Sequence, residues 1–352
     1  MNILVTGADG QLGREIKDRV EKIGNGKPDH FVGEPNYYIF AGRNELDITD
    51  ENAVMKYAKD NHINIVVNCA AYTNVEKAQE DRDNAYNVNA LGPMYLATAM
   101  NKCGGLLIHI STDYVFKHVG RSVPVPPVSI GENVIEYPDA DRDECFYGYS
   151  KGVGEHLIQQ VKGARYIIIR TSWLYSEYGK NFVKTMSERA IDRKITKVVN
   201  DQIGSPTYAG DLADFILHII ENNNSDKRYL SKTGIYNFSN KGFATWYAFA
   251  KEIFIRLVGE NETARILEPC DSKEFKSNVV RPSYSVLDVK KTEDAFGYKI
   301  RYWHDALIDS AIDKIEKEIR KRRNQIKMML DLENTEYDYG HNVDMEKNYS
   351  ED

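Results

Sequence analysis

Tyr147 and Lys151 lie four residues apart in the segment YGYSK, a spacing that places two side chains on the same face of a helix. An ammonium group close to a phenol lowers the pKa of the phenol, so the tyrosine can act as an acid or base near neutral pH. Tyr149 is the other phenol in this segment, but its neighbour one helical turn later is Val153, which is apolar. Tyr147 and Lys151 are therefore the candidate proton-transfer pair.

A hydroxyl-bearing segment, STDYVF, precedes this pair and ends an apolar run that is typical of a buried strand. Ser111 or Thr112 could place a hydroxyl group beside the oxygen atom that receives the proton, and Asp113 follows directly. A hydroxyl at a strand end is common on its own. Its place in the chain ahead of Tyr147 and Lys151 makes the group a candidate for combined proton and hydride transfer.

Glycines near the start of the chain supply the third chemical element. The apolar run at residues 3–5 predicts a buried strand, and a helix is expected from about Gln11. Gly7, Gly10 and Gly13 would permit, in turn, a tight turn, close approach of a pyrophosphate to the backbone, and close packing of helix on strand. The spacing TGxxGxxG, placed between a strand and a helix, therefore predicts a dinucleotide-binding loop.

These groups need a sheet to position them, and the first half of the chain alternates between strand-like and helix-like segments. Strands are expected at residues 2–7, 37–42, 63–71, 105–116 and 164–175. Helices are expected between them at about 11–20, 50–60, 84–102 and 147–161. The alternation predicts an α/β fold with a Rossmann-type doubly wound parallel sheet, in which ligands bind at the C-terminal ends of the strands.

The pattern loosens after Tyr175, where helices are expected at about 181–193, 212–222 and 246–258. We divide the chain into a dinucleotide-binding domain (1–172), a smaller C-terminal substrate-binding domain (173–320) and a charged tail (321–352). Some segments of the second domain are expected to return to the main sheet. The proline-rich segment 117–145 is too long for an ordinary connection, so we expect a surface excursion near the active site.

Composition limits the classes of function. The 352 residues are 42% hydrophobic and 28% charged, as in ordinary soluble proteins, and the net charge of −7 argues against nucleic-acid binding. No apolar run has the length of a membrane span, and the N-terminus lacks the basic region of a signal peptide. The four cysteines form no Cys-x-x-Cys pair. We therefore expect a cytoplasmic protein without a disulfide framework.

Stretches spread over residues 1–290 carry a resemblance to a known family. They are TGADGQLGRE, LDITD, VNCAAYTNVEKAQ, NVNALGP, ISTDYVF, YGYSKGVGE, IIRTSWLYSEYGKNFV, DQIGSPTYAGDLA and RPSYSVLD. In these motifs the chain resembles the dTDP-4-dehydrorhamnose reductases, which are extended short-chain dehydrogenase/reductases. That family reduces the C4 ketone of dTDP-4-dehydro-L-rhamnose with NADPH or NADH and gives dTDP-L-rhamnose. The resemblance implies the same activity here, in the synthesis of a deoxysugar nucleotide for cell-surface polysaccharide.

The resemblance implies a role for each matching residue. Tyr147 would donate a proton to O4, Lys151 would tune Tyr147 and hold the nicotinamide ribose, and Thr112 would orient the carbonyl group. The cofactor would be bound by Gly7, Gly10, Gln11, Leu12, Gly13, Arg43, Asp47, Ile48, Ala70, Ala71, Tyr72, Asn89, Tyr147 and Lys151. The sugar nucleotide would contact Thr112, Asp113, Trp173, Asn181 and Arg281. Trp173 could instead be ordinary core, and Arg281 could be a surface ion pair.

The choice of cofactor depends on Arg43, which follows the second strand where the 2′-phosphate of NADPH would lie. An acid at that place would instead bond the ribose hydroxyls of NAD. We therefore expect NADPH, with NADH also usable. Members of the family often pair through acidic residues around a magnesium (Mg) ion, so a homodimer and a magnesium site without assigned ligands are further expectations. Longer segments at 24–37, 117–145 and after Arg320 depart from the family pattern, and the second could change which sugar nucleotide enters.

Two other classes of function stay open. An epimerase or dehydratase on the same scaffold would retain its cofactor and cycle it within one turnover. Asp113, beside Thr112, could be the acid that a dehydratase needs. A non-catalytic regulatory subunit is also an alternative, because the beta subunit of methionine adenosyltransferase resembles this family. The intact set of Thr112, Tyr147 and Lys151 favours an enzyme, since a pure binding protein need not keep it.

Overall fold

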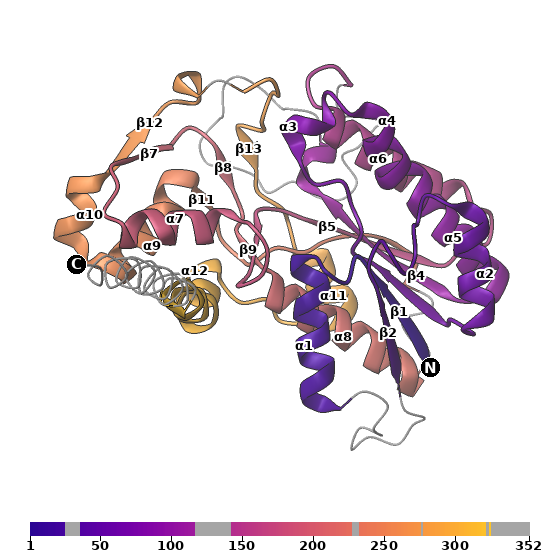
Figure 1. Cartoon of the computed structure of the whole chain (residues 1–352). Coiled ribbons are helices and arrows are strands. Elements are labelled where there is room, and N and C mark those ends of the chain that lie inside the picture. Colours follow the sequence, from indigo (N-terminus) through magenta and orange to yellow (C-terminus); the bar gives the residue numbers. More distant parts are fainter. Residues whose placement is uncertain (25–35, 117–141, 227–231, 276, 322–323, 325–352) are drawn as a thin grey trace, which may run out of the picture.

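The computed structural model describes all residues except 25–35, 117–141, 227–231, 276, 322–323 and 325–352. At its centre is a sheet with the strand order β10-β5-β4-β3-β1-β2, in which all neighbouring strands are parallel. The strands are β1 (Asn2–Thr6), β2 (Tyr37–Ala41), β3 (Ile65–Asn68), β4 (Leu106–Thr112), β5 (Tyr166–Thr171) and β10 (Gly234–Asn237). This is the Rossmann-type doubly wound sheet that the alternating sequence predicted (Figure 1).

Helices cover both faces of this sheet (Figure 1). They are α1 (Gln11–Ile23), α2 (Glu51–Asp60), α5 (Gly92–Cys103), α6 (Phe146–Gln160), α8 (Ala209–Asp226) and α11 (Lys290–Phe296). The short helices α3 (Val75–Ala78) and α4 (Arg82–Tyr86) lie between β3 and α5 in the chain. The side chain of Asp50 caps α2 by accepting a hydrogen bond from the backbone N–H of Ala53, which fixes where that helix begins.

Alternating side chains bury the two faces of the sheet. Ile3 and Val5 of β1 pack in the core formed with α1 and α8, whereas Leu4 packs in the core formed with α2 and α5. All three side chains are buried. A parallel sheet that is covered on both faces needs apolar residues at successive positions, which explains the uninterrupted apolar run that begins the chain.

The helix expected at 84–102 is interrupted. The structure divides it into α4, a π-helical turn (Asn87–Leu91) and α5. Pro93 follows the turn and has no backbone N–H, so it cannot donate the hydrogen bond that a continuous α-helix would require there. Turns of this kind often occur at functional sites. Here the turn contains Asn89, whose side chain bonds to the segment after β3.

The remaining elements pack around a second hydrophobic core. They are β6 (Leu174–Tyr175), α7 (Phe182–Ile191), β7 (Thr196–Val199), β8 (Ile203–Gly204), β9 (Thr207–Tyr208), β11 (Ala244–Thr245), α9 (Trp246–Val258), α10 (Glu260–Ile266), β12 (Leu267–Cys270), β13 (Tyr284–Ser285) and α12 (Trp303–Ala306). This core includes Tyr175, Val183, Phe249 and Leu307. The elements α8, β10 and α11 come from the same half of the sequence but pack on the large sheet. Sequence order and spatial grouping therefore differ in this half.

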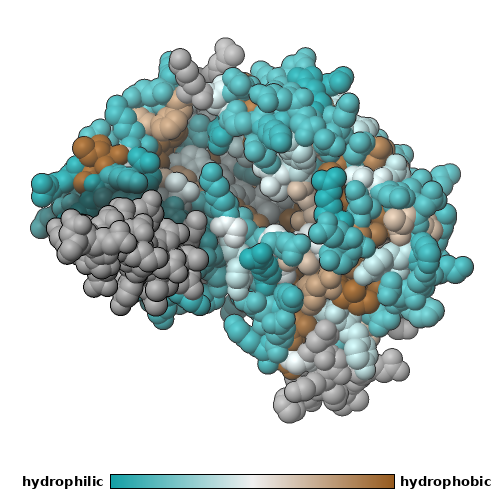
Figure 2. Space-filling model, in the orientation of Figure 1, coloured by the Kyte–Doolittle hydropathy of each residue, from teal (hydrophilic) through white to brown (hydrophobic). Residues whose placement is uncertain are grey.

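Some predicted segments lie outside the described residues. These are most of the loop at 24–37, most of the excursion at 117–145 and almost all of the charged tail. In the described part of the chain, every helix is too short or too polar to cross a membrane. The face shown in Figure 2 carries mostly hydrophilic residues, with hydrophobic residues in small, separate areas.

Candidate active site

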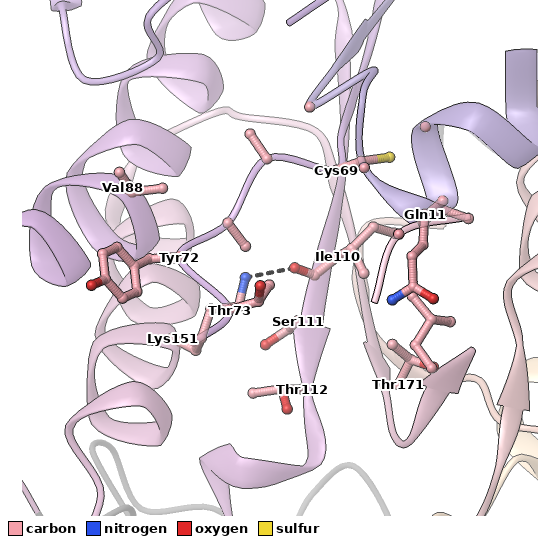
Figure 3. A pocket seen from close by; sticks show the side chains of 18 of the residues that line it. Gln11, Cys69, Tyr72, Thr73, Val88, Ile110, Ser111, Thr112, Lys151 and Thr171 are labelled. Atoms are coloured by element: carbon pink, nitrogen blue, oxygen red, sulfur yellow. Dashed lines mark hydrogen bonds between the residues drawn. The ribbon is translucent and has the colours of Figure 1, made fainter. Parts of the chain in front are cut away.

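A cleft of about 820 Å³ lies at the C-terminal ends of the strands, where a doubly wound sheet binds ligands. Its walls come from the glycine turn, from the ends of β2 to β5, and from α6 (Figure 3). Predicted site residues that line it are Gly7, Gly10, Gln11, Leu12, Gly13, Arg43, Asp47, Ile48, Ala70, Ala71, Tyr72, Thr112, Asp113, Tyr147, Lys151 and Trp173. Asn89, Asn181 and Arg281 are not part of this lining.

The glycine turn between β1 and α1 leaves room for a pyrophosphate. Gly7 has a φ of +63°, and a Cβ atom there would lie 2.6 Å from the backbone nitrogen of Ala70. A Cβ atom on Gly13 would lie 2.5 Å from the carbonyl oxygen of Gly7. Among the described residues no side chain caps α1 at Gly10, so the first backbone N–H groups of the helix are available to a ligand. These residues fit a dinucleotide cofactor.

Tyr147 lies at the start of α6, and its ring packs edge-on against Tyr114 with 5.6 Å between the ring centroids. Burial raises the pKa of Tyr147 above its usual value, and hydrogen bonding with Thr112 opposes part of this shift. The expected lowering of this pKa by Lys151 is not found, because Lys151 directs its Nζ to the carbonyl oxygen of Ile110 instead. Tyr147 is therefore protonated near neutral pH, as an acid must be before it donates.

Lys151 is buried on α6, behind the cleft surface. Its Nζ donates to the carbonyl oxygen of Ile110 at 2.7 Å (Figure 3) and lies 3.3 Å from Nε2 of His109. Burial lowers the pKa of Lys151 to about 8, although the charge of Glu155 favours its charged form. Lys151 can therefore change its protonation state near neutral pH.

The end of β4 presents Thr112 and Asp113 to the cleft. Oγ1 of Thr112 lies 3.1 Å from Oδ1 of Asp113 and accepts a hydrogen bond from the backbone N–H of Tyr114. The second carboxyl oxygen of Asp113 is buried and has no hydrogen-bond partner among the residues that the structure describes. Burial raises the pKa of Asp113 to about 6. Asp113 therefore lies at the cleft with one of its carboxyl oxygens enclosed by protein.

A buried ion pair supports β4 from behind. Nη2 of Arg170 lies 2.6 Å from Oε2 of Glu155, and both side chains are fully buried. Ser111 donates to the other oxygen of the same carboxylate. Two buried charges are tolerated only when their hydrogen bonds are satisfied, so this group fixes the position of Thr112, the next residue along β4.

One end of the cleft is lined by residues that follow β2. Arg43 is 80% exposed, and its Nε is 3.7 Å from the carboxylate of Asp47. Two other acids lie near the end of β2: Glu45 accepts a hydrogen bond from the backbone N–H of Gly42 at 2.8 Å, and the carboxylate of Asp9 also lies close to Gly42. A long, exposed ion pair is worth little, so the Arg43 guanidinium is free to bind an anionic group of a ligand.

Asn89 supports the cleft from the π-helical turn. Its Oδ1 accepts from the backbone N–H of Tyr72 at 2.9 Å, and its Nδ2 donates to the carbonyl oxygen of Tyr72 and to the hydroxyl of Ser150, both at 3.1 Å. These bonds hold the segment Ala70–Tyr72, which lines the cleft. Asn89 is fully buried, so it acts by positioning this segment.

Trp173 forms an aromatic wall on the side of the second core. Its φ is +47°, which is uncommon for a bulky residue. Its indole ring stacks on Trp246 with 3.5 Å between centroids. Gly204 lies against the ring, where a Cβ atom would be 2.5 Å from Cε2. The neighbouring residues thus hold Trp173 in an unusual backbone conformation with its ring at the cleft.

Asn181 and Arg281 are held by other protein groups. Asn181 caps α7 by accepting from the backbone N–H of Lys184, and it donates to Oε1 of Gln11 at 2.9 Å. Nη2 of Arg281 lies 3.0 Å from Oε1 of Glu76, and both side chains are about two-fifths exposed. Arg281 therefore forms a partly exposed ion pair with Glu76, and its contact with the diphosphate stays a prediction.

Sequence reasoning passed over other residues of the cleft. They are Asp9, Gly42, Leu46, Cys69, Thr73, Val75, Val88, Ile110, Tyr114, Thr171, Ser172, Leu174, Gly179 and Lys180. Thr171 is the last residue of β5, as Thr112 is the last residue of β4, and Ser172 follows directly. This shared position at a strand end could have identified both residues as part of the cleft. The cation Lys180, beside a glycine in the segment SEYGKNFV, was another.

A magnesium site gains no support from the structure. Within the described ranges there is no group of three or more histidine, cysteine, aspartate or glutamate side chains that could hold a metal ion. All four cysteines are free thiols, in agreement with their scattered spacing.

The parallel sheet, the glycine turn and the group of Thr112, Tyr147 and Lys151 define an NAD(P)-dependent oxidoreductase of the short-chain dehydrogenase/reductase class. The family model described as the RmlD substrate binding domain matches residues 1–316. The chain belongs to this RmlD family, that of the dTDP-4-dehydrorhamnose reductases, as its motifs predicted.

Individual relatives are similar over most of their length. A dTDP-4-dehydrorhamnose reductase from Aggregatibacter actinomycetemcomitans is 36% identical over 313 residues, which are 87% of this chain and 96% of that protein. The crystal structure of a dTDP-4-dehydrorhamnose reductase from Clostridium acetobutylicum has a TM-score of 0.72 at 34% identity, over 92% of this chain and all of that one. The enzyme from Bacillus anthracis, solved in complex with NADP, has a TM-score of 0.72 at 33% identity, over 87% of this chain and 96% of that one.

Proposed function

We propose that this protein reduces the C4 ketone of dTDP-4-dehydro-L-rhamnose with NADPH and forms dTDP-L-rhamnose. The observation that carries the proposal is the meeting of Thr112, Tyr147 and Lys151 in one cleft with the glycine turn. The 36% identity to a reductase of that name supports the choice of substrate. When bound, the cofactor supplies a hydride to C4.

The residues of the cleft then have defined tasks. Tyr147, which burial keeps protonated, donates its hydroxyl proton to O4. Thr112 offers its hydroxyl to the same oxygen and orients the carbonyl group. Lys151 lies one helical turn beyond Tyr147 on α6 and, in its ammonium form, can return a proton to the phenolate that forms. The carboxyl group of Asp113, beside Thr112 at the cleft, accepts a hydrogen bond from a sugar hydroxyl.

Arg43 supports NADPH as the preferred cofactor. Its exposed guanidinium lies beyond β2 with only a weak protein partner, and guanidinium matches the geometry of phosphate oxygens. The NADP complex of the Bacillus anthracis relative agrees with this preference. NADH as a second usable cofactor, the homodimer and the cytoplasmic location stay predictions.

The experiment combines purified protein, NADPH and freshly prepared dTDP-4-dehydro-L-rhamnose. We expect one NADPH to be oxidised for each dTDP-L-rhamnose formed, with the absorbance loss and the product measured in the same sample. The Tyr147→Phe variant serves as the matched control. An unchanged ketosugar with intact NADPH would overturn the proposal.

A dehydratase or epimerase is the second candidate, because the carboxyl group of Asp113 lies beside Thr112, with 3.1 Å between Oδ1 and Oγ1. Such an enzyme would convert a sugar nucleotide such as dTDP-glucose without net consumption of cofactor. A regulatory subunit would bind NADPH but convert neither sugar. The same assay, run with each sugar and analysed for products, separates the three functions.

A further inference from the structure

A line of buried hydrogen bonds connects β1 to Lys151 behind the cleft. It joins Thr6, Asn68, His109 and Lys151, which lie on β1, β3, β4 and α6. The distances are 2.7 Å from Thr6 Oγ1 to Asn68 Oδ1, 3.0 Å from Asn68 Nδ2 to His109 Nδ1, and 3.3 Å from His109 Nε2 to Lys151 Nζ. Each of these side chains is at most 1% exposed, so bulk water does not compete for the contacts.

The direction of these bonds is fixed by the backbone of Ala70. Its N–H group can only donate, and it lies 3.2 Å from Oδ1 of Asn68, so the amide oxygen faces Ala70 and Thr6. The amide nitrogen of Asn68 therefore faces His109 and donates to Nδ1. Burial and the nearby Lys151 hold the pKa of His109 well below its usual range. A neutral imidazole that accepts at Nδ1 carries its proton on Nε2.

This proton points toward Lys151. An ammonium group has no lone pair, so it cannot bond to the N–H of His109. A lysine in its amine form has a lone pair that accepts from Nε2–H, and it can still donate to the carbonyl oxygen of Ile110. The contact therefore favours the amine form of Lys151 over the ammonium form.

We propose that Asn68 and His109 are positioning residues that hold the imidazole proton on Nε2 and thereby stabilise the amine form of Lys151. This inference rests on the proposed reductase function, in which Lys151 acts behind Tyr147. When the ammonium and amine forms of a lysine are close in free energy, the ammonium form can give a proton to the phenolate of Tyr147 and become the amine that His109 stabilises. It then regains its own proton from solvent, so no net charge is left behind after turnover.

The anion on the same helix does not cancel this effect. Glu155 lies one turn beyond Lys151 on α6 and favours the ammonium form. Its carboxylate, however, is 2.6 Å from Nη2 of Arg170 and accepts a hydrogen bond from Ser111. Burial of Lys151 outweighs the charge of Glu155, since the pKa of Lys151 is lowered overall to about 8.

Of the remaining titratable groups around the site, Cys69 and Tyr147 are uncharged near neutral pH, whereas Asp113, with a pKa of about 6, is mostly ionised but is not among the groups that shift the pKa of Lys151. Burial raises the pKa of Cys69, at the end of β3, to about 12, so it is a neutral thiol. Burial also keeps Tyr147 protonated. Asp113, at the end of β4, bonds to Thr112 and faces the cleft. His109 is thus the group whose proton position distinguishes the two forms of Lys151 through a direct contact.

The first test measures the proton position on His109 directly. Nitrogen-15 NMR of the imidazole rings in the full chain distinguishes a protonated from an unprotonated ring nitrogen. The His109 signal is identified by its loss in His109→Phe. We expect a neutral ring with its proton on Nε2, and a proton on Nδ1 or a charged ring would overturn the inference. The measurement needs no substrate, so its outcome is separate from that of the proposed function.

The second test, Asn68→Asp, replaces the hydrogen-bond donor that faces His109 by an acceptor. A carboxylate accepts where the amide donates, so the imidazole proton moves to Nδ1 and the Nε2 lone pair faces Lys151. The ammonium form is then favoured, and we expect the alkaline limb of kcat/KM for NADPH oxidation to move up by about one pH unit, a tenfold change in proton concentration. An alkaline limb that stays in place after the NMR shows a switched proton would refute the proposal.

Thr6→Val is the matched control for that experiment. It removes the hydrogen bond at the far end of the line but leaves Ala70 to orient the amide of Asn68. We expect the imidazole proton to stay on Nε2 and the alkaline limb to stay at its wild-type pH. A shift equal to that of Asn68→Asp would show that loss of packing, and not the proton position, sets the profile, and would refute the assigned role.

Discussion

Nδ2 of Asn181 donates to Oε1 of Gln11 across 2.9 Å, and this bond joins the start of α7 to the start of α1. Gln11 lines the cleft directly after the glycine turn, whereas Asn181 lies behind the lining. The other atom of the same amide, Oδ1, accepts from the backbone N–H of Lys184 and caps α7. One side chain therefore connects the cofactor side of the cleft with the second hydrophobic core.

Asn181→Ala should weaken binding on both sides of the cleft. We expect a several-fold rise in KM for NADPH and for the ketosugar, and a loss of about 1 kcal/mol of unfolding free energy from the missing helix cap. Two-substrate kinetics and urea unfolding measure these effects. Asn181→Ser should recover the cap and the stability while both KM values stay raised. Recovery of KM together with stability would show that Asn181 serves only as a cap.

Tyr147→Phe should abolish most of the turnover. Removal of the phenolic hydroxyl takes away the proposed acid, so kcat should fall on the order of a hundredfold or more while NADPH binding is retained. Stopped-flow absorbance and fluorescence titration measure the two properties. Tyr149→Phe is the control, because Tyr149 lies on the same helix and packs against Phe146. A larger loss in the Tyr149 variant would make Tyr149 the acid.

Arg43→Ala should change the choice of cofactor. Loss of the guanidinium that faces the expected 2′-phosphate should raise KM for NADPH about tenfold and leave KM for NADH unchanged. Steady-state kinetics with each cofactor provide the ratio. Lys102→Ala removes an exposed cation at the end of α5 and controls for the change in net charge. Equal effects of Arg43→Ala on both cofactors would contradict the assignment.

Local patterns made much of the fold and part of the site predictable. The glycine turn depends on residues within one strand–turn–helix unit, so its spacing was enough to place Gly7 and Gly13 at the cleft. The positions of β3 and β4 followed from their apolar runs, but the two strands end at Asn68 and Thr112, earlier than the expected residues 71 and 116. The interruption of the helix expected at 84–102 did not follow from periodicity, because it reflects the missing N–H of Pro93 and the tertiary bonds of Asn89.

Contacts between distant segments were beyond the reach of the sequence. Asn181 and Gln11 are 170 residues apart, and the stack of Trp173 on Trp246 joins a strand end to a helix start. The spacing of Tyr147 and Lys151 correctly placed both on α6 but gave the wrong direction for the pKa of Tyr147. Burial decides that pKa, and the extent of burial depends on the whole fold.

Glu15 should make the protein less stable as pH rises. It is 1% exposed on α1, and burial together with its neighbour Glu177 raises the pKa of Glu15 from 4.5 to about 8. Between these pH values the folded chain keeps a proton that the unfolded chain has lost. The unfavourable contribution is therefore absent below about pH 4.5, grows as pH rises, and is complete above about pH 8.

Glu15→Gln tests this dependence, because glutamine has nearly the same shape and stays neutral. We expect the variant to exceed the wild type by about 1–2 kcal/mol in unfolding free energy at pH 9 and to match it at pH 4.5. Urea unfolding at the two pH values gives both differences. A variant that is less stable than the wild type at pH 9 would show that the ionised carboxylate gains more from Arg19 than it loses by burial.

Gly204→Ala should reduce binding of the sugar nucleotide without affecting the cofactor. The added Cβ would lie 2.5 Å from Cε2 of Trp173, so the indole ring must move away from its stack on Trp246. We expect KM for the ketosugar to rise about tenfold while KM for NADPH is unchanged. Near-ultraviolet circular dichroism should report the altered stacking of the two rings. Gly152→Ala is the matched control, since its Cβ would meet nothing closer than 4.0 Å. A change in circular dichroism with an unchanged KM for the ketosugar would show that Trp173 is structural and does not contact the substrate.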